Sequence, residues 1–409
     1  MAIRRNPDSK NLGQNRDDVR QHNLATLLRM IHEEGTVSRS QLTTKSGLNR
    51  STISDLVAQL VELGLVTEEE TAPASGVGRP SLLVTASNKV IAFAVNPDID
   101  AVTVGMIGLA GEVFKRKRQP LSAPVKPEKA VQVAASIIQD FRAELANDIR
   151  IVGIGLAIPG QVRHDDGVVR FAPHLDWVEV PIAKMMSQAT GLPVFADNDA
   201  SIGCNAEHMF GSGKGYDDMV YLFASTGGIG GGVIIEGHQL RGTAGYAGEL
   251  GHVRIASNND PDYSGLPGTL ESELRRDEVL DALKLFAAAD DELLQGMSQV
   301  SDSKAIKLIH RQVDSLAVGI ANFLNIFNPQ IVVLGGYLSG LLEFDAERLF
   351  EVVRRHSLGS ANDRVVIRAG ELGANLLMVG AAEVAFNELM RDPSGTETFP
   401  AKAKSKSGK

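Results

Sequence analysis

Five polar side chains in the middle of the sequence are of types that hydrogen-bond to hydroxyl groups. Asn198 and Asp199 follow the apolar run PVFA, so we expect them at the carboxyl end of a strand, where α/β proteins collect ligand-binding residues. Glu249 and His252 are three residues apart in GELGH and can share one face of a turn, and Glu271 ends the next loop. Each has a structural alternative: Asp199 could cap the following helix, His252 could be a buried core histidine, and Glu271 could simply begin a helix.

Short β-rich runs alternate with helical stretches from residue 89 onward, which is typical of an α/β domain. The runs include VIAFAV, VTVGMIG, VGIGLAI, PVFADND, MVYLFA, GGVIIEG and IVVLGG. They fall into two sets, so we expect a first lobe over residues 89–205 and a second lobe over residues 206–389 that includes a returning C-terminal helix. A cleft between two lobes is a common place for a small ligand, and the polar residues above should face it.

Residues 17–88 have the pattern of a winged helix-turn-helix domain, which is an α+β fold. Apolar residues with helical spacing come first, and this helix should end at Gly35: Leu24, Leu27, Leu28 and Ile31. A second helix should begin at a capping box formed by Ser38 and Gln41 and stop at Gly47. The apolar face of a third helix follows: Ile53, Leu56, Val57, Leu60 and Val61.

Polar side chains at the starts of the second and third helices are the predicted DNA contacts, together with one arginine further on. They are Ser38, Arg39, Asn49, Arg50, Ser51, Thr52, Ser54 and Arg79. Arg79 stands between Gly78 and Pro80 in a segment between two expected short strands, over residues 65–71 and 81–85. An arginine on such a wing suits a narrow A·T-rich minor groove, although the segment could also be a plain surface hairpin.

Charge and composition set limits on the class of protein. The net charge is −9, but residues 1–90 hold 11 basic and 10 acidic residues, so the acidity belongs to the rest of the chain. The single cysteine, Cys204, excludes an internal disulfide and any site of several thiolates. The sequence has no apolar run long enough to cross a membrane and no signal peptide, so we expect a cytoplasmic protein. Residues 1–16 and 390–409 are polar and unpatterned, and we expect both to be disordered.

The stretch from residue 191 to residue 252 closely resembles the ROK family of repressors and sugar kinases. Further motifs are similar in the family's order: IPG at 158–160, APHLDW at 172–177, NPQIVVLGG at 328–336 and ELGANLLMVGAA at 371–382. The resemblance implies a two-lobed, actin-like fold related to ribonuclease H. It also implies that Asn198, Asp199, Glu249, His252 and Glu271 hold a sugar, and that the position of Asp199 is the base in the family's kinases.

Phosphoryl transfer needs a cradle for the nucleotide's phosphates, because positioning and charge neutralisation supply most of the catalysis. The family's kinases use an Asp-x-Gly-Gly-Thr hairpin, which falls here on Asn96, Pro97, Asp98, Ile99 and Asp100. Two carboxylates replace the glycine and threonine positions and would repel phosphate. The glycine-rich loop at 225–230 also has its threonine displaced by one place. We therefore expect no ATP binding and no kinase activity.

Many members of the family also hold zinc with three cysteines and the histidine of the GH motif. The corresponding loop here, residues 262–271, has no cysteine, although its glycines and Glu271 remain. His252 and Asp262 alone are too few ligands, so we expect no metal site and no cofactor.

The sequence as a whole therefore predicts a sugar-responsive transcriptional regulator, with induction of a repressor as the expected direction. Its partners would be a double-stranded DNA operator and a sugar or sugar phosphate, and the chain would act as a homodimer or homotetramer whose recognition helices enter successive major grooves. One alternative is an active hexose or amino-sugar kinase with a regulatory head. Another is an interaction protein with a vestigial sugar cleft.

Overall fold

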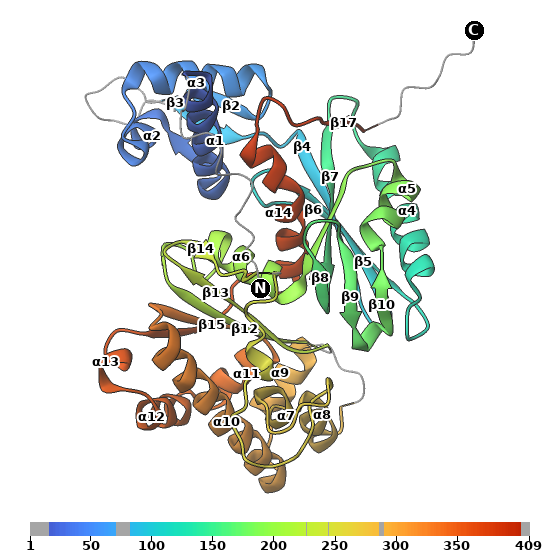
Figure 1. Ribbon diagram of the computed structural model, residues 1–409, viewed down its shortest axis with the longest axis vertical. Coiled ribbons are helices and arrows are strands. Elements are labelled where there is room, and N and C mark those ends of the chain that lie inside the picture. Colours follow the sequence, from blue (N-terminus) through green and yellow to red (C-terminus); the bar gives the residue numbers. More distant parts are fainter. Residues whose placement is uncertain (1–15, 71–81, 226, 244, 286–289, 402–409) are drawn as a thin grey trace, which may run out of the picture.

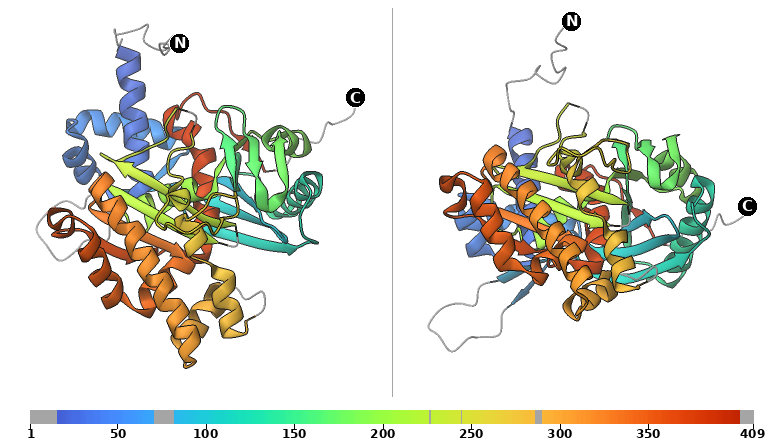
Figure 2. Two further views of the ribbon diagram at one scale, coloured as in Figure 1. Left: turned by 60° about the horizontal axis from the view of Figure 1, so that its bottom comes forward. Right: turned by 90° about the horizontal axis from the view of Figure 1, so that it is seen from below.

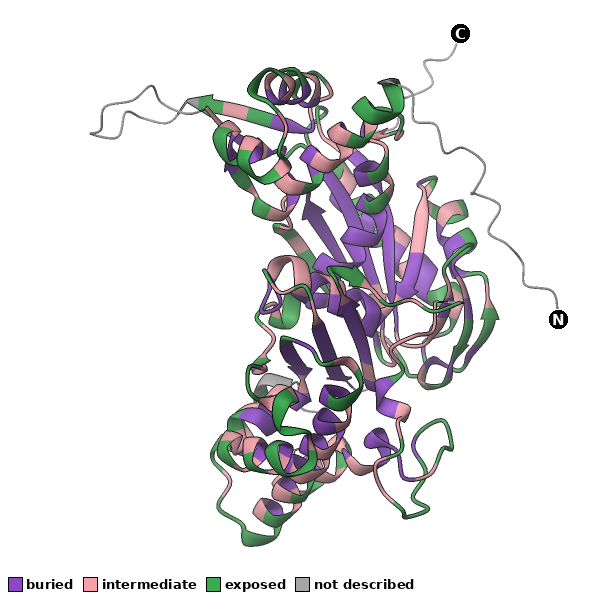
Figure 3. Ribbon diagram, turned by 60° about the vertical axis from the view of Figure 1, so that its left-hand side comes forward, coloured by how far each residue is buried: buried purple, intermediate pink, exposed green. Residues whose placement is uncertain are grey.

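The computed structural model describes residues 16–70, 82–225, 227–243, 245–285 and 290–401 (Figure 1). An N-terminal head, in blue, lies beside the first lobe and above the second, and the two lobes follow one another along the chain. Each lobe is built on a sheet whose strands are largely buried (Figure 3). No helix within these ranges combines the length and the apolar character needed to cross a membrane.

The head is a winged helix domain of three helices and a small antiparallel sheet in the order β1-β3-β2. Its elements are α1 (Arg16–Glu34), β1 (Thr36–Ser38), α2 (Arg39–Ser46), α3 (Arg50–Glu62), β2 (Val66–Glu70) and β3 (Leu82–Ala86). Ser38 and Gln41 form the predicted capping box, and Gly47 ends α2 at a φ of 70°, where glycine avoids a side-chain clash. The apolar face of α3 is buried as predicted, except that Val61 is exposed.

The first lobe has a central sheet in the order β11-β7-β4-β5-β6. Its elements are β4 (Val90–Pro97), β5 (Ala101–Gly108), β6 (Val113–Pro120), α4 (Pro127–Glu144), β7 (Arg150–Ile158), β8 (Gln161–Arg163), β9 (Val168–Ala172), β10 (Trp177–Val180), α5 (Ile182–Thr190), β11 (Val194–Asn198) and α6 (Asp199–Phe210). Both faces of the sheet are covered: Phe93 of β4 packs in the core cluster with α4 and α5, and its neighbour Ala94 packs in the cluster with α14. This accounts for the unbroken apolar run of β4.

The second lobe has a five-stranded sheet in the order β14-β13-β12-β15-β16. Its elements are β12 (Met219–Ser225), β13 (Gly228–Ile235), β14 (His238–Gln239), α7 (Leu270–Glu273), α8 (Arg276–Leu283), α9 (Asp290–Ser298), α10 (Ser303–Phe327), β15 (Ile331–Gly336), α11 (Tyr337–Phe344), α12 (Ala346–His356), α13 (Gly359–Asn362) and β16 (Val366–Ala369). The parallel and antiparallel strands and the two-lobed arrangement confirm the predicted α/β fold.

Two predictions about the C-terminal part are wrong. Helix α14 (Leu376–Arg391) packs mainly between the head and the sheet of the first lobe, and only its start also contacts strands of the second lobe (Figures 1 and 2). The contact is close, since a Cβ atom added to Gly155 of β7 would lie 1.7 Å from the carbonyl oxygen of Ala381. The chain beyond it is not a disordered tail from residue 390, because β17 (Phe399–Pro400) pairs antiparallel with β7. It pairs with the first residues of β7, Arg150 and Ile151, which β11 does not reach, and these backbone hydrogen bonds order a polar segment that has little apolar surface of its own.

Candidate functional site

The end of β11 and the start of α6 place the first two predicted site residues. The Asn198 side chain caps α6, because its Oδ1 accepts a hydrogen bond from Ser201 N at 3.0 Å, and its Nδ2 donates to Gly160 O at 3.0 Å. Asn198 rather than Asp199 therefore fills the role of helix cap, which the sequence left open for Asp199. The carboxylate of Asp199 is left to face the interlobe region from the first turn of α6.

The charge state of Asp199 is unusual. Burial raises the pKa of this carboxyl to about 7; the hydrogen bond from Ala200 N opposes the shift, and the neighbouring carboxylates of Asp98 and Glu249 add to it. Near neutral pH the group is therefore divided between its protonated and ionised forms. A buried carboxyl with such a pKa, located where two lobes meet, is typical of a ligand-binding site.

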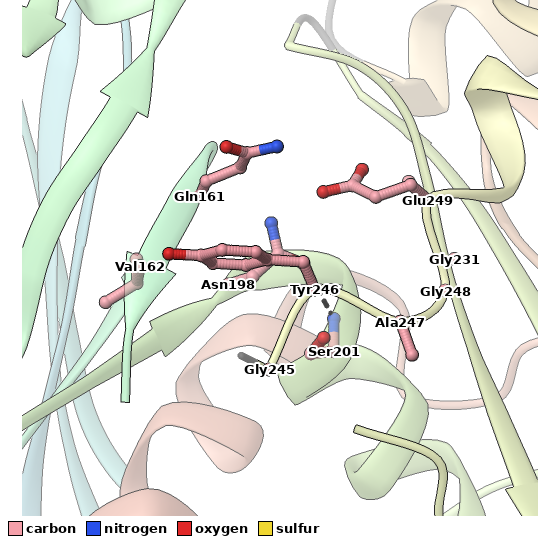
Figure 4. A pocket seen from close by; sticks show the side chains of 11 residues that line it. Gln161, Val162, Asn198, Ser201, Gly231, Gly245, Tyr246, Ala247, Gly248 and Glu249 are labelled. Atoms are coloured by element: carbon pink, nitrogen blue, oxygen red, sulfur yellow. Dashed lines mark hydrogen bonds between the residues drawn. The ribbon is translucent and has the colours of Figure 1, made fainter. Parts of the chain in front are cut away.

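A pocket between the lobes adjoins these residues (Figure 4). Asn198, Ser201 and Gln161 line it from the first lobe, and Tyr246 and Glu249 line it from the second. Figure 4 shows the Tyr246 ring reaching across the pocket toward β8, and the carboxylate of Glu249 pointing into it. Amide, carboxylate and aromatic groups that converge in this way suit a polyhydroxylated ligand.

The remaining two predicted residues form an adjacent buried group. Glu271 is 4% exposed, and its Oε2 accepts a hydrogen bond from Ile229 N at 2.7 Å. Burial raises its pKa, although that hydrogen bond and the nearby His252 oppose the shift. Burial lowers the pKa of His252, but its hydrogen bond to Asp262 and the neighbouring carboxylates Glu271 and Glu249 outweigh burial and leave it raised. The structure thus brings all five predicted residues to one region.

Asp262 organises the loop that carries this group. One of its carboxylate oxygens accepts hydrogen bonds from His252 Nδ1 at 2.8 Å and Thr269 Oγ1 at 2.9 Å. The other accepts from Ser264 N, Ser264 Oγ and Leu266 N at 2.7–2.9 Å. Burial by itself would raise the pKa of Asp262, but these hydrogen bonds outweigh it and lower the pKa to about 2. A single carboxylate therefore ties together the segment from His252 to Thr269.

The residues of this loop do not fit a zinc site. His252, Asp262 and Glu271 each have one ligand-type atom within 4.8 Å of the others. However, Asp262 already accepts five hydrogen bonds, including one from the Nδ1 of His252, and Glu271 accepts two, from Ile229 N and Tyr263 N. Cys204 is buried in a separate core cluster among apolar side chains. A structural zinc site needs four free ligands, usually with thiolates among them.

We predict that protein dialysed against buffer without a chelator contains less than about 0.1 zinc per chain, because too few free ligands are present for tight binding. Inductively coupled plasma mass spectrometry on the purified protein measures this directly. One zinc per chain that survives the dialysis would show that the hydrogen bonds of Asp262 give way to metal coordination.

Replacing Asp262 with asparagine should loosen the loop, because an amide nitrogen cannot accept the hydrogen bonds that one carboxylate oxygen receives. We expect a loss of stability on the order of 2 kcal/mol near pH 7. The pKa of the folded state is depressed, so this stabilisation is present above about pH 4 and is lost as the pH falls toward 2. Thermal unfolding of Asp262→Asn and of the exposed control Asp260→Asn at pH 7 and pH 3 tests this. Equal stability of the two variants at pH 7 would contradict it.

The hairpin that replaces the kinase phosphate cradle joins β4 to β5. Asp98 N donates to Ala101 O at 2.8 Å, and the Asp98 carboxylate accepts from Ile99 N at 2.8 Å. Asp100 pairs with Arg118 at 2.7 Å. Burial lowers the pKa of His174 and raises that of Asp199; the charge of Asp98 opposes the first shift and adds to the second, so this carboxylate lies near the cleft. The hairpin therefore brings negative charge to a place where a kinase needs neutral backbone amides.

The structure changes the predicted DNA contacts. Ser38 is buried and its hydroxyl bonds to Gln41, so it shapes α2 and is not free to reach DNA. Arg39 donates two hydrogen bonds of 2.6 Å to Glu68 and a third to Ser54 Oγ at 2.9 Å. Through these bonds the Arg39 side chain joins α2 to β2 and to α3, and Ser54 is engaged in the same network. Ser38, Arg39 and Ser54 stay predictions as DNA contacts, but their bonds within the head show that a residue next to a helix start can serve the helix itself.

The start of α3 keeps the other predicted contacts on its surface. Asn49 is exposed but caps α3 by accepting from Thr52 N at 2.9 Å. Arg50 and Ser51 are exposed and Thr52 is partly exposed, so this first turn is the surface of the head best suited to a major groove. Arg79 lies outside the described residues, and its role stays a prediction.

Several residues of the site were missed from the sequence. Gln161 and Tyr246 line the pocket, and Arg241 of the second lobe pairs with the buried Asp197 of the first lobe at 2.9 Å. His174 and Tyr263 make a ring contact of 4.6 Å between the lobes. The proximity of Gln161 to the IPG motif and of Tyr246 to GELGH was the available signal, but these types of side chain are common in loops.

The sequence matches the ROK family over residues 93–388 and the MarR family over residues 22–70. A xylose repressor of Caldicellulosiruptor bescii is 26% identical over 92% of this chain and 98% of that protein. A glucokinase of Thermotoga maritima is 30% identical over 69% of this chain and 93% of that protein.

Among solved structures, a ROK family transcriptional regulator described as a homologue of the Escherichia coli Mlc protein is similar over 91% of this chain and 97% of its own, with a TM-score of 0.74 and 23% identity. This likeness supports the fold of the described residues in both lobes and in the head. Since the family match covers most of the residues that form both lobes, the chain belongs to the ROK family.

Proposed function

We propose that this protein is a sugar-responsive transcriptional repressor without kinase activity. Its head binds operator DNA through the first turn of α3, and a sugar binds between the lobes and releases the DNA. The observation that carries the proposal is that one chain combines a winged helix head with a polar interlobe pocket, beside which the phosphate hairpin carries Asp98. The xylose repressor among its relatives aligns over 92% of this chain and 98% of its own length, so the alignment includes both the head and the lobes.

The effector we propose is a neutral sugar. Four carboxyl groups lie in or beside the pocket: those of Asp98, Asp199, Glu249 and Glu271. The negative charges of Asp98 and Glu249 add to the effect of burial in raising the pKa of Asp199. A phosphate group in this region would add repulsion, whereas sugar hydroxyls donate hydrogen bonds to carboxylates. A sugar phosphate should therefore bind at least about tenfold more weakly than its parent sugar.

The protein should act as a homodimer. One recognition helix reads only one half-site, and two copies related by a two-fold axis would place two of them in successive major grooves. The alternative function is that of an active sugar kinase, because a glucokinase is among the relatives. The carboxylates of the hairpin and the displaced threonine of the second loop favour the repressor.

Two measurements test the proposal. Calorimetric titration with D-xylose, D-glucose and N-acetyl-D-glucosamine, each with its phosphate ester, should find a neutral sugar that binds, and fluorescence anisotropy should show that this sugar weakens DNA binding. A coupled assay with Mg-ATP and the same sugars should show no ADP release above background. Sugar-dependent ADP release that disappears in Asp199→Asn would establish the kinase instead, and the absence of sugar binding would remove the effector from the proposal.

A further inference from the structure

A buried charged pair joins the head to helix α14. His32, in the last turn of α1, is 0% exposed, and its Nε2 lies 2.7 Å from Oε2 of Glu383. Its Nδ1 contacts the carbonyl oxygen of Leu109, in the first lobe. A carbonyl oxygen only accepts hydrogen bonds, so Nδ1 of the ring donates to Leu109, and a protonated ring also donates from Nε2 to Glu383. Burial favours the neutral ring, but Glu383, the carbonyl of Leu109 and Glu33 together outweigh burial and raise the pKa of His32.

The same histidine meets the far end of helix α6. Phe210 is the last residue of α6, and its ring contacts the His32 ring edge-on at 5.4 Å between centroids. Directly after α6, Lys214 Nζ donates to the carbonyl oxygen of Glu33 at 2.8 Å. The C-terminal end of α6 therefore contacts the C-terminal end of α1 through a ring contact and a hydrogen bond.

The other end of α6 lies in the sugar pocket. Asn198 caps the helix and Asp199 begins it, so its 12 residues span about 18 Å from the pocket to His32. Two neighbours hold the helix closely along this length: a Cβ atom on Gly380 of α14 would lie 2.2 Å from Ile202, and one on Gly232 of β13 would lie 2.5 Å from Cys204. Packing this tight moves a helix as a unit rather than bending it.

We infer that α6 couples the sugar pocket to the DNA-binding head. A change in the position of α6 would act on α1 through the contact of Phe210 with the His32–Glu383 pair. The inference rests on the proposed function and adds the route by which sugar acts on the head. A sugar held by Asn198 and Asp199 shifts the N-terminal end of α6, and Phe210 passes that shift to His32. The pair responds because Oε1 of Glu383 is buried without a hydrogen bond among the described residues, so a displaced His32 ring would leave this carboxyl group without its contact at Oε2 as well.

The test separates sugar binding from coupling. The coupling is the ratio of the dissociation constants for DNA with and without saturating sugar, and the sugar probes are D-xylose, D-glucose and N-acetyl-D-glucosamine. The DNA is a fragment selected by the sugar-free wild-type protein from a random library. The wild-type ratio should be about tenfold or more. In Phe210→Ala the affinity for sugar should stay within about threefold of wild type, while the ratio falls below about twofold.

A matched control exists in the second lobe. Phe344 contacts His310 at 5.4 Å, the same ring separation as in the Phe210 pair, and Phe344→Ala should keep the wild-type ratio. His32→Gln should lose coupling as Phe210→Ala does, and the double variant should lose no more than either alone, because both act on one contact. If Phe210→Ala does not fold, Phe210→Leu takes its place with a ratio at least threefold below wild type expected.

The outcomes are distinguishable. Sugar binding with a wild-type ratio in Phe210→Ala and His32→Gln would overturn the coupling through α6 and leave the proposed function intact. A wild-type protein that binds none of the sugars, or whose DNA affinity does not respond to the bound sugar, would overturn the proposed function and the inference together. Hydrogen exchange of residues 24–34 gives a second readout: sugar should change it in wild type and in Phe344→Ala but not in Phe210→Ala.

Discussion

Asp199→Asn should bind the effector sugar about 100-fold more weakly than wild type at pH 8, because a hydroxyl then loses a hydrogen bond to a charged acceptor. The variant should still bind DNA, since the head is separate from the pocket, and should therefore no longer be released by sugar. Calorimetry with the sugar and anisotropy with DNA measure the two properties. The exposed control Asp165→Asn should match wild type in both.

The same variant should be more stable than wild type. Burial in the folded protein raises the pKa of Asp199 from its ordinary value of about 4 to about 7, so this carboxyl destabilises the folded state most when the pH exceeds 7. Removing the charge should add stability on the order of 3 kcal/mol above pH 7, and the gain should shrink as the pH falls and vanish below about 4. Thermal unfolding at pH 8 and pH 4 tests the sign, and a destabilised variant at pH 8 would contradict the buried, perturbed carboxyl.

Wild-type sugar affinity should depend on pH for the same reason. If the ionised form of Asp199 accepts the hydroxyl, affinity should be constant well above pH 7 and fall by up to about tenfold per pH unit below it. In Asp199→Asn this dependence should disappear.

Arg50→Ala should lower the affinity for selected DNA by about 10- to 100-fold, because an arginine in the major groove contributes about 1–3 kcal/mol. Arg50 begins α3, and its side chain is exposed beside Ser51 in the turn that faces outward from the head. Fluorescence anisotropy at several salt concentrations distinguishes its role: loss of discrimination between sequences indicates a base contact, and a smaller salt slope with unchanged discrimination indicates a phosphate contact.

The matched control for this variant is Arg354→Ala. Arg354 is an exposed arginine on α12 of the second lobe, so its removal changes the net charge equally without touching the head. Its affinity for DNA should stay within about twofold of wild type. If Arg50→Ala and Arg354→Ala lost affinity equally, DNA would be bound by overall charge and the assignment of the first turn of α3 would fall.

Local patterns in the sequence determined the features that depend on neighbouring residues. The capping box of Ser38 and Gln41 and the stop at Gly47 were predicted because a cap involves residues within one helical turn. The carboxylates of the phosphate hairpin and the missing thiolates were also evident, because a motif is defined by residue types at fixed spacing. The family resemblance then brought five separated polar residues into one predicted site.

Only the tertiary structure decided which distant residues meet. Nothing in the polar end of the sequence shows that β17 pairs with β7 or that α14 packs under the head, since these contacts depend on the start of β7 that β11 leaves unpaired and on the sheet face that the folded lobe leaves open. His32 and Glu383 are 351 positions apart, and each interrupts an apolar face, where a polar side chain is costly unless it finds a partner. The sequence shows both interruptions, but not that the two residues pair with each other. Periodicity identifies the apolar face of a helix, but it does not show which other element packs against that face.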